Sequence, residues 1–508
     1  MAPGRIPAKS LSFSIGLLSL GAETLWVRTY AFLGESTPKA VALVLGVYLI
    51  GIALGADVGA RLCERRREHL REVLVASLLS ASAVILLSPF VLAATVKLSP
   101  EVVFGRSVPI LLAFLPAFLF SISFPICHHL GTSLQAGQIG KSMSRVYAAN
   151  IAGSVAGPLL VNFVVLQFAT TQLAFALIGL LGATLGTAFF AYAAPTRALR
   201  LGAAACALIS GASIAASTGP RNWLIESLSA SALPVRRVVE TRQGIIVAYR
   251  DDGQGDTIFG GNVYDGRTNL DVRLNSNGIN RILVLAALRP KPRRVLVIGL
   301  SIGSWSYLIG GFPGVEEIDA VEINPGYLDL IRDYPAQSRA LADPRVRLHI
   351  GDGRKFLRSV ASGSYDLVVM NTTWHWRAYI SLLLSREYLT LLSSRLAPGG
   401  LLAFNTTWSP DALHTAASVF PHAYLYDNFA ICADYDWRRV LAEPASVDAL
   451  LAVRPEGRPL LTEADKPLAL DFLSAKRTAT AADLARKAGR PLEVITDRNL
   501  VTEYRYGR

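Results

Sequence analysis

The chain has 508 residues, of which 52% are hydrophobic and 17% are charged, and its mean hydropathy is +0.38. This length exceeds that of one ordinary globular domain, and the composition is too apolar for a typical soluble protein. The net charge of +12 does not indicate nucleic-acid binding, because the Arg and Lys residues lie in short loops between apolar runs or are scattered. The four cysteines form no CxxC pair, so the sequence predicts no metal site.

Long apolar runs fill the first 218 residues. About 20 apolar residues cross the hydrocarbon core of a bilayer as a helix. The sequence predicts seven such segments, at 11–33, 38–60, 73–96, 107–130, 145–168, 171–193 and 199–217. We therefore expect an α-helical multi-pass domain over 1–218, with the lipid bilayer of the cell (inner) membrane as its partner.

Glycines at four-residue spacing predict close contacts between these helices. Gly51, Gly55 and Gly59 fall on one helix face, where a neighbouring helix can approach closely, and Gly153 and Gly157 repeat the spacing. The first segment also carries two ionisable residues, Glu23 and Arg28. Ionisable groups within a span face the interior of the bundle, so this pair is either a structural ion pair or a polar site.

The charges of the short loops predict the orientation of the chain in the membrane. The loop over 61–71 contains five arginines, whereas the opposite side has only Lys39, Lys97 and Arg106. Positive loops stay in the cytoplasm, so the N-terminus is cytoplasmic and seven spans place the soluble half outside. If 145–168 and 171–193 form one broken unit instead, the soluble half lies inside.

From residue 219 onward the sequence is typical of a soluble α/β protein. Residues 219–289 contain two short β-like runs, at 235–240 and 244–249, with a turn-rich segment after them. This pattern predicts a small β lead-in domain. A Rossmann-type domain is then expected over 290–440, followed by a C-terminal extension over 441–508.

The first strand of the Rossmann-type domain leads into a loop of small residues. An apolar run at 294–298 is followed by Gly299, Ser301, Gly303 and Ser304, and a helix is expected from about Trp305. Small residues let the backbone approach a ligand, and a helix N-terminus offers free N–H groups. The third glycine of the dinucleotide fingerprint is missing.

Acidic residues end the next two strands. Glu322 ends the run at 318–322, where a carboxylate can accept hydrogen bonds from ribose hydroxyls. Asp352 follows the run at 346–350 and can accept the adenine amino group, and a fourth run at 365–370 ends at Asn371. The predicted nucleoside-binding residues are Gly299, Ser301, Gly303, Glu322, Asp352, Gly353 and Asn371. A NAD-type or a non-binding Rossmann domain is the alternative.

These residues lie within a longer resemblance to spermidine synthase. The matching segments are DPRV at 343–346, GDGRKFL at 351–357, SREY at 385–388 and LAPGG at 396–400. In the apolar half, ETLWVR at 23–28 and YAANIAG at 147–153 resemble the spanning segments of membrane-fused spermidine synthase-like proteins. The resemblance implies the S-adenosylmethionine-dependent methyltransferase fold and a transferase that uses S-adenosylmethionine or its decarboxylated form.

The sequence departs from that family at three places that handle polyamines. Ile302 replaces the acid that holds the amine of the decarboxylated donor, Asn371 replaces the catalytic aspartate, and 277–280 lacks the Tyr-His-Glu segment. Because isoleucine does not repel the carboxylate of intact S-adenosylmethionine, we expect methyl transfer to an unknown acceptor. The alternatives are aminopropyl transfer to a polyamine, or a transporter or sensor that binds a nucleoside without chemistry.

The segment after the fourth strand supplies the remaining candidates for catalysis. Trp374 can present a face to an amine, and His375 can take a proton. Together with Asn371 and Tyr379 they form the predicted catalytic set, although the aromatic residues can instead serve packing. The acceptor is expected to be a small molecule or a protein amine, nucleic acid is not expected as a partner, and the sequence allows a homo-oligomer.

Overall fold

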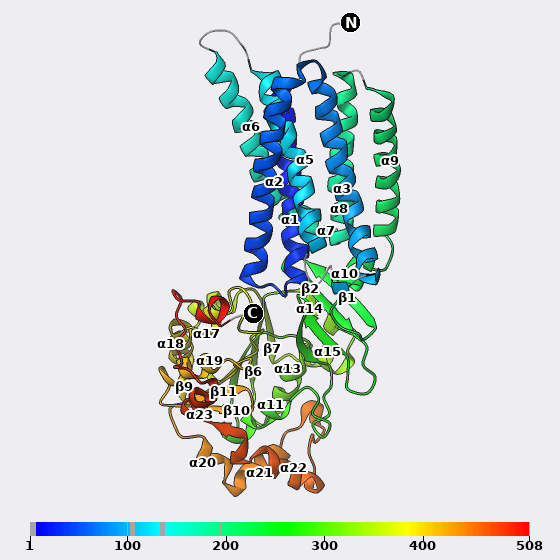
Figure 1. Cartoon of the computed structure of the whole chain (residues 1–508). Helices are drawn as coiled ribbons and strands as arrows, with labels where there is room; N and C mark the ends of the chain where they lie inside the picture. Colours follow the sequence, from blue (N-terminus) through cyan, green and yellow to red (C-terminus); the bar gives the residue numbers. More distant parts are fainter. Residues whose placement is uncertain (1–6, 99, 102–106, 133–137, 194, 507–508) are drawn as a thin grey trace. The chain divides into compact units, whose positions relative to one another are not determined.

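The computed structural model describes residues 7–98, 100–101, 107–132, 138–193 and 195–506. It divides into two compact units, Met1–Ala230 and Ser231–Arg508 (Figure 1). Arg106, which contributes to the predicted loop charges, lies outside the described residues.

The described part of the first unit holds seven helices that are long and apolar enough to cross a membrane. Their bounds are α1 (Ala8–Leu33), α2 (Pro38–Arg65), α3 (Leu70–Leu98), α5 (Ser107–Gly131), α6 (Ile139–Leu160), α8 (Thr171–Ala188) and α9 (Arg197–Ser217). A π-helical turn at Val161–Val165 and the short α7 (Leu166–Phe168) continue α6. The seven predicted segments are confirmed as helices, and 145–168 and 171–193 are two separate helices.

The glycine repeats lie where two helices meet, as the sequence predicts. A Cβ atom on Gly55 of α2 would stand 2.1 Å from the carbonyl oxygen of Phe118 in α5. A Cβ atom on Gly153 of α6 would stand 1.9 Å from the carbonyl oxygen of Phe13 in α1. Only glycine allows the backbones of these helix pairs to approach so closely.

Polar side chains also link the helices of the first unit. The Nε atom of Arg28 donates to Thr171 Oγ1 at 2.9 Å, and the side chain of Asn150 donates to the Ser12 carbonyl at 3.0 Å. The short helix α10 (Trp223–Leu228) is held by Gln172, whose Oε1 accepts from the Leu224 N–H at 3.2 Å. Residues up to 230 therefore belong with the helices, and not with the lead-in domain that is predicted from residue 219.

The lead-in region is a four-stranded antiparallel sheet. Its strands run in chain order, as β1 (Val235–Thr241), β2 (Gly244–Tyr249), β3 (Thr257–Gly260) and β4 (Val263–Arg267). The strand β2 pairs with a neighbour on each edge, and it is buried over most of its length, with Ile246 and Ala248 in a hydrophobic core. Two helical turns, α11 (Asn280–Leu283) and α12 (Leu285–Leu288), then lead to the main sheet.

The main sheet has eight strands in the order β12-β10-β11-β9-β8-β5-β6-β7. Five strands are parallel: β5 (Arg294–Ile298), β6 (Glu317–Glu322), β7 (Val346–Ile350), β8 (Tyr365–Met370) and β9 (Leu396–Asn405). Both faces are covered, by helices that include α13 (Ser304–Ile309), α14 (Gly326–Ile331), α15 (Pro335–Leu341), α16 (Gly353–Ser359), α17 (Ser381–Leu384), α18 (Arg386–Arg395) and α19 (Pro410–Ala417). Central strands buried on both faces explain the continuous apolar runs in the sequence.

The residues after 440 extend this domain. The antiparallel strands β10 (His422–Tyr426) and β11 (Phe429–Ala433) continue the sheet beyond β9, and β12 (Thr478–Ala479) pairs with β10. Three helices lie between β11 and β12 in the sequence: α20 (Arg438–Leu441), α21 (Pro444–Leu451) and α22 (Lys466–Phe472). Leu450 of α21 and Phe472 of α22 belong to the same hydrophobic core as β5 and β8. The chain ends with α23 (Ala481–Ala488) and α24 (Val501–Tyr504).

Candidate functional site

A cavity of about 120 Å³ lies at the carboxyl ends of β5, β8 and β9. Ligands of open parallel sheets bind at this edge, because the connecting loops diverge there. The loops after β5, β8 and β9, the strand β4 and the start of α11 contribute its walls. The lining residues are Tyr264, Asp265, Gly266, Arg267, Asn277, Arg281, Leu300, Ser301, Ile302, Ser304, Trp305, Asn371, Thr372, Thr373, Trp374, Asn405, Thr407, Trp408 and Asn428.

The loop after β5 approaches the end of β8 closely. Gly299 has a φ angle of +81°, and a Cβ atom there would stand 2.4 Å from the carbonyl oxygen of Asn371. The Asn371 N–H donates to the Ile298 carbonyl at 2.8 Å. Gly303, with a φ angle of +80°, precedes α13. Both glycines therefore hold a backbone conformation that other residues rarely adopt, and they place Ser301 and Asn371 on the cavity wall.

Glu322 lies beneath this loop and does not line the cavity. Its two carboxylate oxygens accept hydrogen bonds of 2.8 Å from the backbone N–H groups of Leu300 and Asn324. Burial raises the pKa of Glu322 to about 7, although these hydrogen bonds act in the opposite direction. Each carboxylate oxygen can accept a second hydrogen bond. Glu322 therefore braces the loop and retains the capacity to accept ribose hydroxyls.

Asp352 is exposed and follows the end of the next strand, β7. Its side chain caps α16 by accepting from the Lys355 N–H at 2.7 Å. Two exposed isoleucines lie nearby: Ile323 directly follows β6, and Ile350 ends the neighbouring strand β7. This apolar surface between Glu322 and Asp352 suits an adenine ring, so the residues present fit the predicted nucleoside.

The structure brings together only part of the predicted catalytic set. Asn371 and Trp374 line the cavity, and the Trp374 ring lies 6.2 Å from that of Trp376. His375 Nδ1 lies 2.9 Å from the Thr407 carbonyl oxygen, and Tyr379 is 77% exposed. Neither His375 nor Tyr379 is among the lining residues. Of these two neighbouring rings, Trp374 lines the cavity and Trp376 is buried.

One carboxylate in the cavity was not predicted. Asp265, on β4, is the only acidic residue among the described lining residues. The Tyr327 hydroxyl donates to its carboxylate at 2.6 Å, and burial raises the pKa of Asp265. Nothing local in the sequence marks Asp265 as a site residue, since it lies in a short strand far along the chain from the glycine loop.

A guanidinium was missed in the same way. Arg281 lines the cavity, together with Asn428 from the β10–β11 turn. It is the one charged residue in a run, 279–288, whose other members are buried and apolar except Asn280. A lone charge in a buried helical run is the signal that could have identified it.

Comparisons with known proteins point to one family. Residues 283–433 match the spermine/spermidine synthase domain. The chain is 28% identical to polyamine aminopropyltransferase 2 of Streptomyces coelicolor over 402 residues, which cover 75% of this chain and 68% of the relative. It is 27% identical to spermidine synthase 1 of Datura stramonium over 213 residues, 40% of this chain and 62% of the relative.

A methyltransferase is also among the relatives. Putrescine N-methyltransferase 3 of Nicotiana tabacum is 27% identical over 177 residues, which cover 33% of this chain and 44% of the relative. The chain thus spans less than two thirds of the length of the Datura and Nicotiana relatives. The names of these relatives support the predicted alternative, aminopropyl transfer, better than the first prediction, methyl transfer. In its C-terminal half, this chain is therefore similar to the spermine/spermidine synthase domain.

Proposed function

We propose that this chain transfers an aminopropyl group from decarboxylated S-adenosylmethionine to an amine acceptor. The observation that carries the proposal is the cavity between the glycine loop and Asn371, within a domain that matches spermidine synthases. In this reaction the acceptor nitrogen forms a bond to the aminopropyl carbon while the carbon–sulfur bond breaks. The electron pair stays on sulfur, methylthioadenosine leaves, and the acceptor nitrogen loses one proton.

The donor fits the edge formed by β5, β6 and β7. Glu322 would accept the ribose hydroxyls, and Asp352 and the exposed Ile350 would hold the adenine. Gly299 lets the loop after β5 lie against the Asn371 carbonyl at the end of β8, and the sulfur would lie beside this junction. The sulfonium group already activates its carbon, so the main contribution of the chain is to position the acceptor and exclude water.

Asp265 is our candidate for the proton acceptor. Ile302 and Asn371 cannot accept a proton, whereas Asp265 lines the same cavity and has a pKa raised by burial. A raised pKa makes a carboxylate a better base near neutral pH. We expect Asp265→Asn to lower turnover about a hundredfold, within the range of general-base contributions, with little effect on donor affinity.

The experiment that tests the function is incubation of the purified full-length protein with either donor and a set of amines. Mass spectrometry would then detect the thioether product. Methylthioadenosine identifies aminopropyl transfer, and S-adenosylhomocysteine identifies methyl transfer. If neither product forms with any acceptor, the chain is not a transferase of this class.

Methyl transfer remains a second candidate because of one residue. Ile302 lies in the cavity wall where the family has an acid, so intact S-adenosylmethionine meets no repulsion there. The similarity to a putrescine N-methyltransferase points in the same direction. Restoring the acids, as Ile302→Asp with Asn371→Asp, should shift preference toward the decarboxylated donor. An unchanged preference would count against this explanation of the two positions.

We also propose that the seven helices span a membrane and that the catalytic unit lies outside the cytoplasm. Large apolar side chains are exposed along these helices, including Leu49 (55% exposed), Val155 (58%) and Leu208 (76%), as expected of surfaces that face lipid. The arginines of 61–71 favour a cytoplasmic location for that loop. Alkaline phosphatase and a cytosol-only fluorescent reporter, fused in turn after Arg508, test the location. Fluorescence without phosphatase activity would refute the external location.

A further inference from the structure

We propose that Arg281 binds a carboxylate group of a molecule held in the cavity, which extends the function proposed above. The guanidinium lies on the cavity wall and is not paired with a carboxylate among the ion pairs of the described residues. Two molecules could present a carboxylate: an amino-acid acceptor in either reaction, and the methionyl tail of intact S-adenosylmethionine in methyl transfer. Arg281 would bind the carboxylate of either molecule in the same way.

The neutral partners of Arg281 leave part of its hydrogen-bonding capacity unused. Its Nε donates to the Gly278 carbonyl at 2.7 Å, its Nη2 to the Asn277 carbonyl at 3.1 Å, and its Nη1 to Asn428 Oδ1 at 2.5 Å. A guanidinium has five N–H donors, so these three bonds leave two N–H groups, one on each Nη atom. Two such groups can bind a carboxylate in a bidentate manner.

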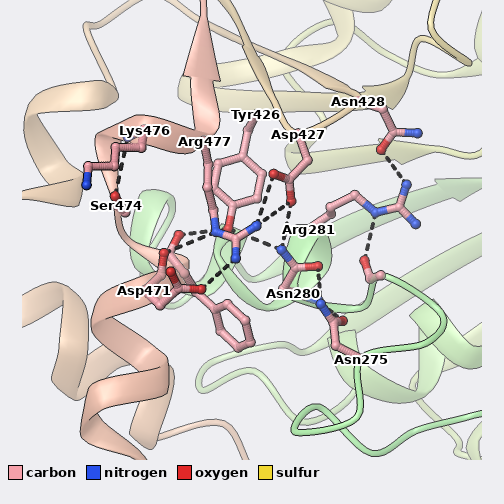
Figure 2. A network of polar contacts seen from close by, with 12 residues as sticks. Asn275, Asn280, Arg281, Tyr426, Asp427, Asn428, Asp471, Ser474, Lys476 and Arg477 are labelled. Atoms are coloured by element: carbon pink, nitrogen blue, oxygen red, sulfur yellow. Dashed lines mark hydrogen bonds and ion pairs between the residues drawn. The ribbon is translucent and has the colours of Figure 1, made fainter.

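A network of neighbouring residues holds the guanidinium in position (Figure 2). One face lies over the Phe429 ring, with 4.8 Å between the guanidinium carbon and the ring centroid. Asn428, which binds Arg281, follows Asp427 in the β10–β11 turn, and the Asn280 amide donates to Asp427 at 2.9 Å. Because these contacts come from two segments, 277–278 and 428–429, Arg281 is oriented before any ligand enters, which reduces the entropic cost of binding.

The one acid near Arg281 in this network is already used by another cation. Asp427 accepts two hydrogen bonds from Arg477 Nη1, at 3.1 and 3.2 Å, in addition to the bond from Asn280. Arg477 also pairs with Asp471 at 2.6 Å. Arg281 is therefore a largely buried cation surrounded by carbonyls, an amide and rings. Burying a cation without a carboxylate is costly, and an anionic ligand would offset that cost.

The remaining charges of the cavity agree with a ligand that carries both an amine and a carboxylate. Arg267 is paired with Asp251 at 2.7 Å, so its charge is offset inside the protein. Asp265 and Arg281 are then the two charged groups on the described lining whose charge is not offset by an ion pair. A simple diamine would meet a carboxylate at one end and a guanidinium at the other.

Two matched ligand pairs test the proposal by calorimetry on the purified full-length protein. S-adenosylmethionine and its decarboxylated form differ only in the donor carboxylate. L-ornithine and putrescine differ only in the carboxylate of the acceptor, and they are titrated with methylthioadenosine present. We expect one pair to show a preference of roughly tenfold to a hundredfold for the carboxylate form, the range of a charge-assisted hydrogen-bonded pair. The pair that shows it identifies the source.

The variant Arg281→Met should abolish this preference, and Arg281→Lys should retain part of it. Arg267→Met is the matched control, because that arginine also lines the cavity but is already paired. Binding of methylthioadenosine, which has no carboxylate, reports whether each variant is folded. Equal affinities within both pairs in the unaltered protein, or an undiminished preference in folded Arg281→Met, would overturn the proposal. Absence of any thioether product would instead refute the transferase function and leave carboxylate binding unaffected.

Discussion

Glycine meets different physical demands in the two units of this chain. In the helical unit, Gly55 and Gly153 have ordinary helical backbones, and the space for a side chain is filled by the backbone of a neighbouring helix. In the α/β unit, Gly299 and Gly303 have φ angles near +80° and shape the loop at the cavity. A substitution in the first unit should therefore affect the packing of helices, whereas one in the second should affect the cavity.

Polar side chains differ between the units in a related way. In the helices, hydroxyl groups such as those of Thr29 and Ser82 donate to the carbonyl four residues earlier, at 2.8 and 2.7 Å. In the α/β unit, polar partners are often far apart in the sequence, as for Arg281 with Asn428 and Arg354 with Asp497. A hydrogen-bond partner within the same helix suits a segment in lipid, because no water is available there to bind polar groups. Distant partners suit a site assembled from loops.

The largest effect is expected from Gly153→Ala in the helical unit. The added Cβ atom would stand 1.9 Å from the Phe13 carbonyl oxygen, so α1 and α6 must separate. We expect a loss of about 3 kcal/mol in the free energy of unfolding, the upper range for overpacking. Denaturant unfolding of the protein in detergent measures it.

Gly46→Ala is the control, since no atom lies within 4 Å of its Cβ position, and it should stabilise the helix slightly. Equal stabilities of the two variants would contradict the packing role.

Gly299→Ala tests the other role of glycine. Its Cβ atom would stand 2.4 Å from the Asn371 carbonyl oxygen, in a backbone conformation with positive φ. We expect a cost of about 1–3 kcal/mol and weaker binding of methylthioadenosine, because the loop must move away from β8. Thermal unfolding and calorimetry measure the two effects.

In Gly253→Ala, where the nearest atom lies 4.0 Å from the Cβ position, stability and methylthioadenosine binding should both stay unchanged. A Gly299→Ala protein that binds normally would show that the loop does not contact the ligand.

The pH dependence of donor binding tests Glu322. Because the charged carboxylate accepts ribose hydroxyls, donor affinity should rise with pH up to the pKa of about 7 and stay constant above it. Stability of the ligand-free protein should change in the opposite direction. A carboxyl group whose pKa is raised from 4.5 to about 7 stabilises the fold fully below pH 4.5, and this contribution is lost as pH rises to about 7. Calorimetry between pH 5.5 and 8.5 measures binding.

Two variants of Glu322 sharpen this test. Glu322→Gln should remove the pH dependence of binding, and Glu322→Ala should cost roughly 1–3 kcal/mol of donor affinity. An affinity that does not depend on pH in the unaltered protein would argue that Glu322 only braces the glycine loop.

Asp352 should give the smallest effect, because its side chain is exposed and caps α16. Asp352→Ala should lower stability and donor affinity by about 1 kcal/mol each. Asp352→Asn retains a capping oxygen, so its stability should stay near that of the unaltered protein, and calorimetry would isolate the contribution to binding. Unchanged donor affinity in both Asp352→Ala and Glu322→Ala would refute the nucleoside site.

The helices and the glycine loop could be predicted from the sequence because their signals are local. A span needs only a continuous apolar run, and 38–60 and 107–130 provide one each. A buried strand followed by small residues likewise predicts the turn at Gly299 and Gly303, which the positive φ angles confirm. The α10 helix was missed as part of the first unit, since its place depends on contacts with residues distant in the sequence, among them Gln172 and Phe90.

The sequence by itself determined the order of the elements, the seven apolar helices and the positions of Glu322, Asp352 and Asn371 at strand ends. Only the tertiary structure decided which side chains share the cavity. Asp265 and Arg281 lie near each other in the sequence, whereas Asn428 comes 147 residues after Arg281. They meet because the lead-in sheet, α11 and the β10–β11 turn all border the carboxyl edge of β5 and β8. Hydropathy and spacing describe neighbours along the chain, whereas the chemistry of this cavity depends on side chains that folding brings together.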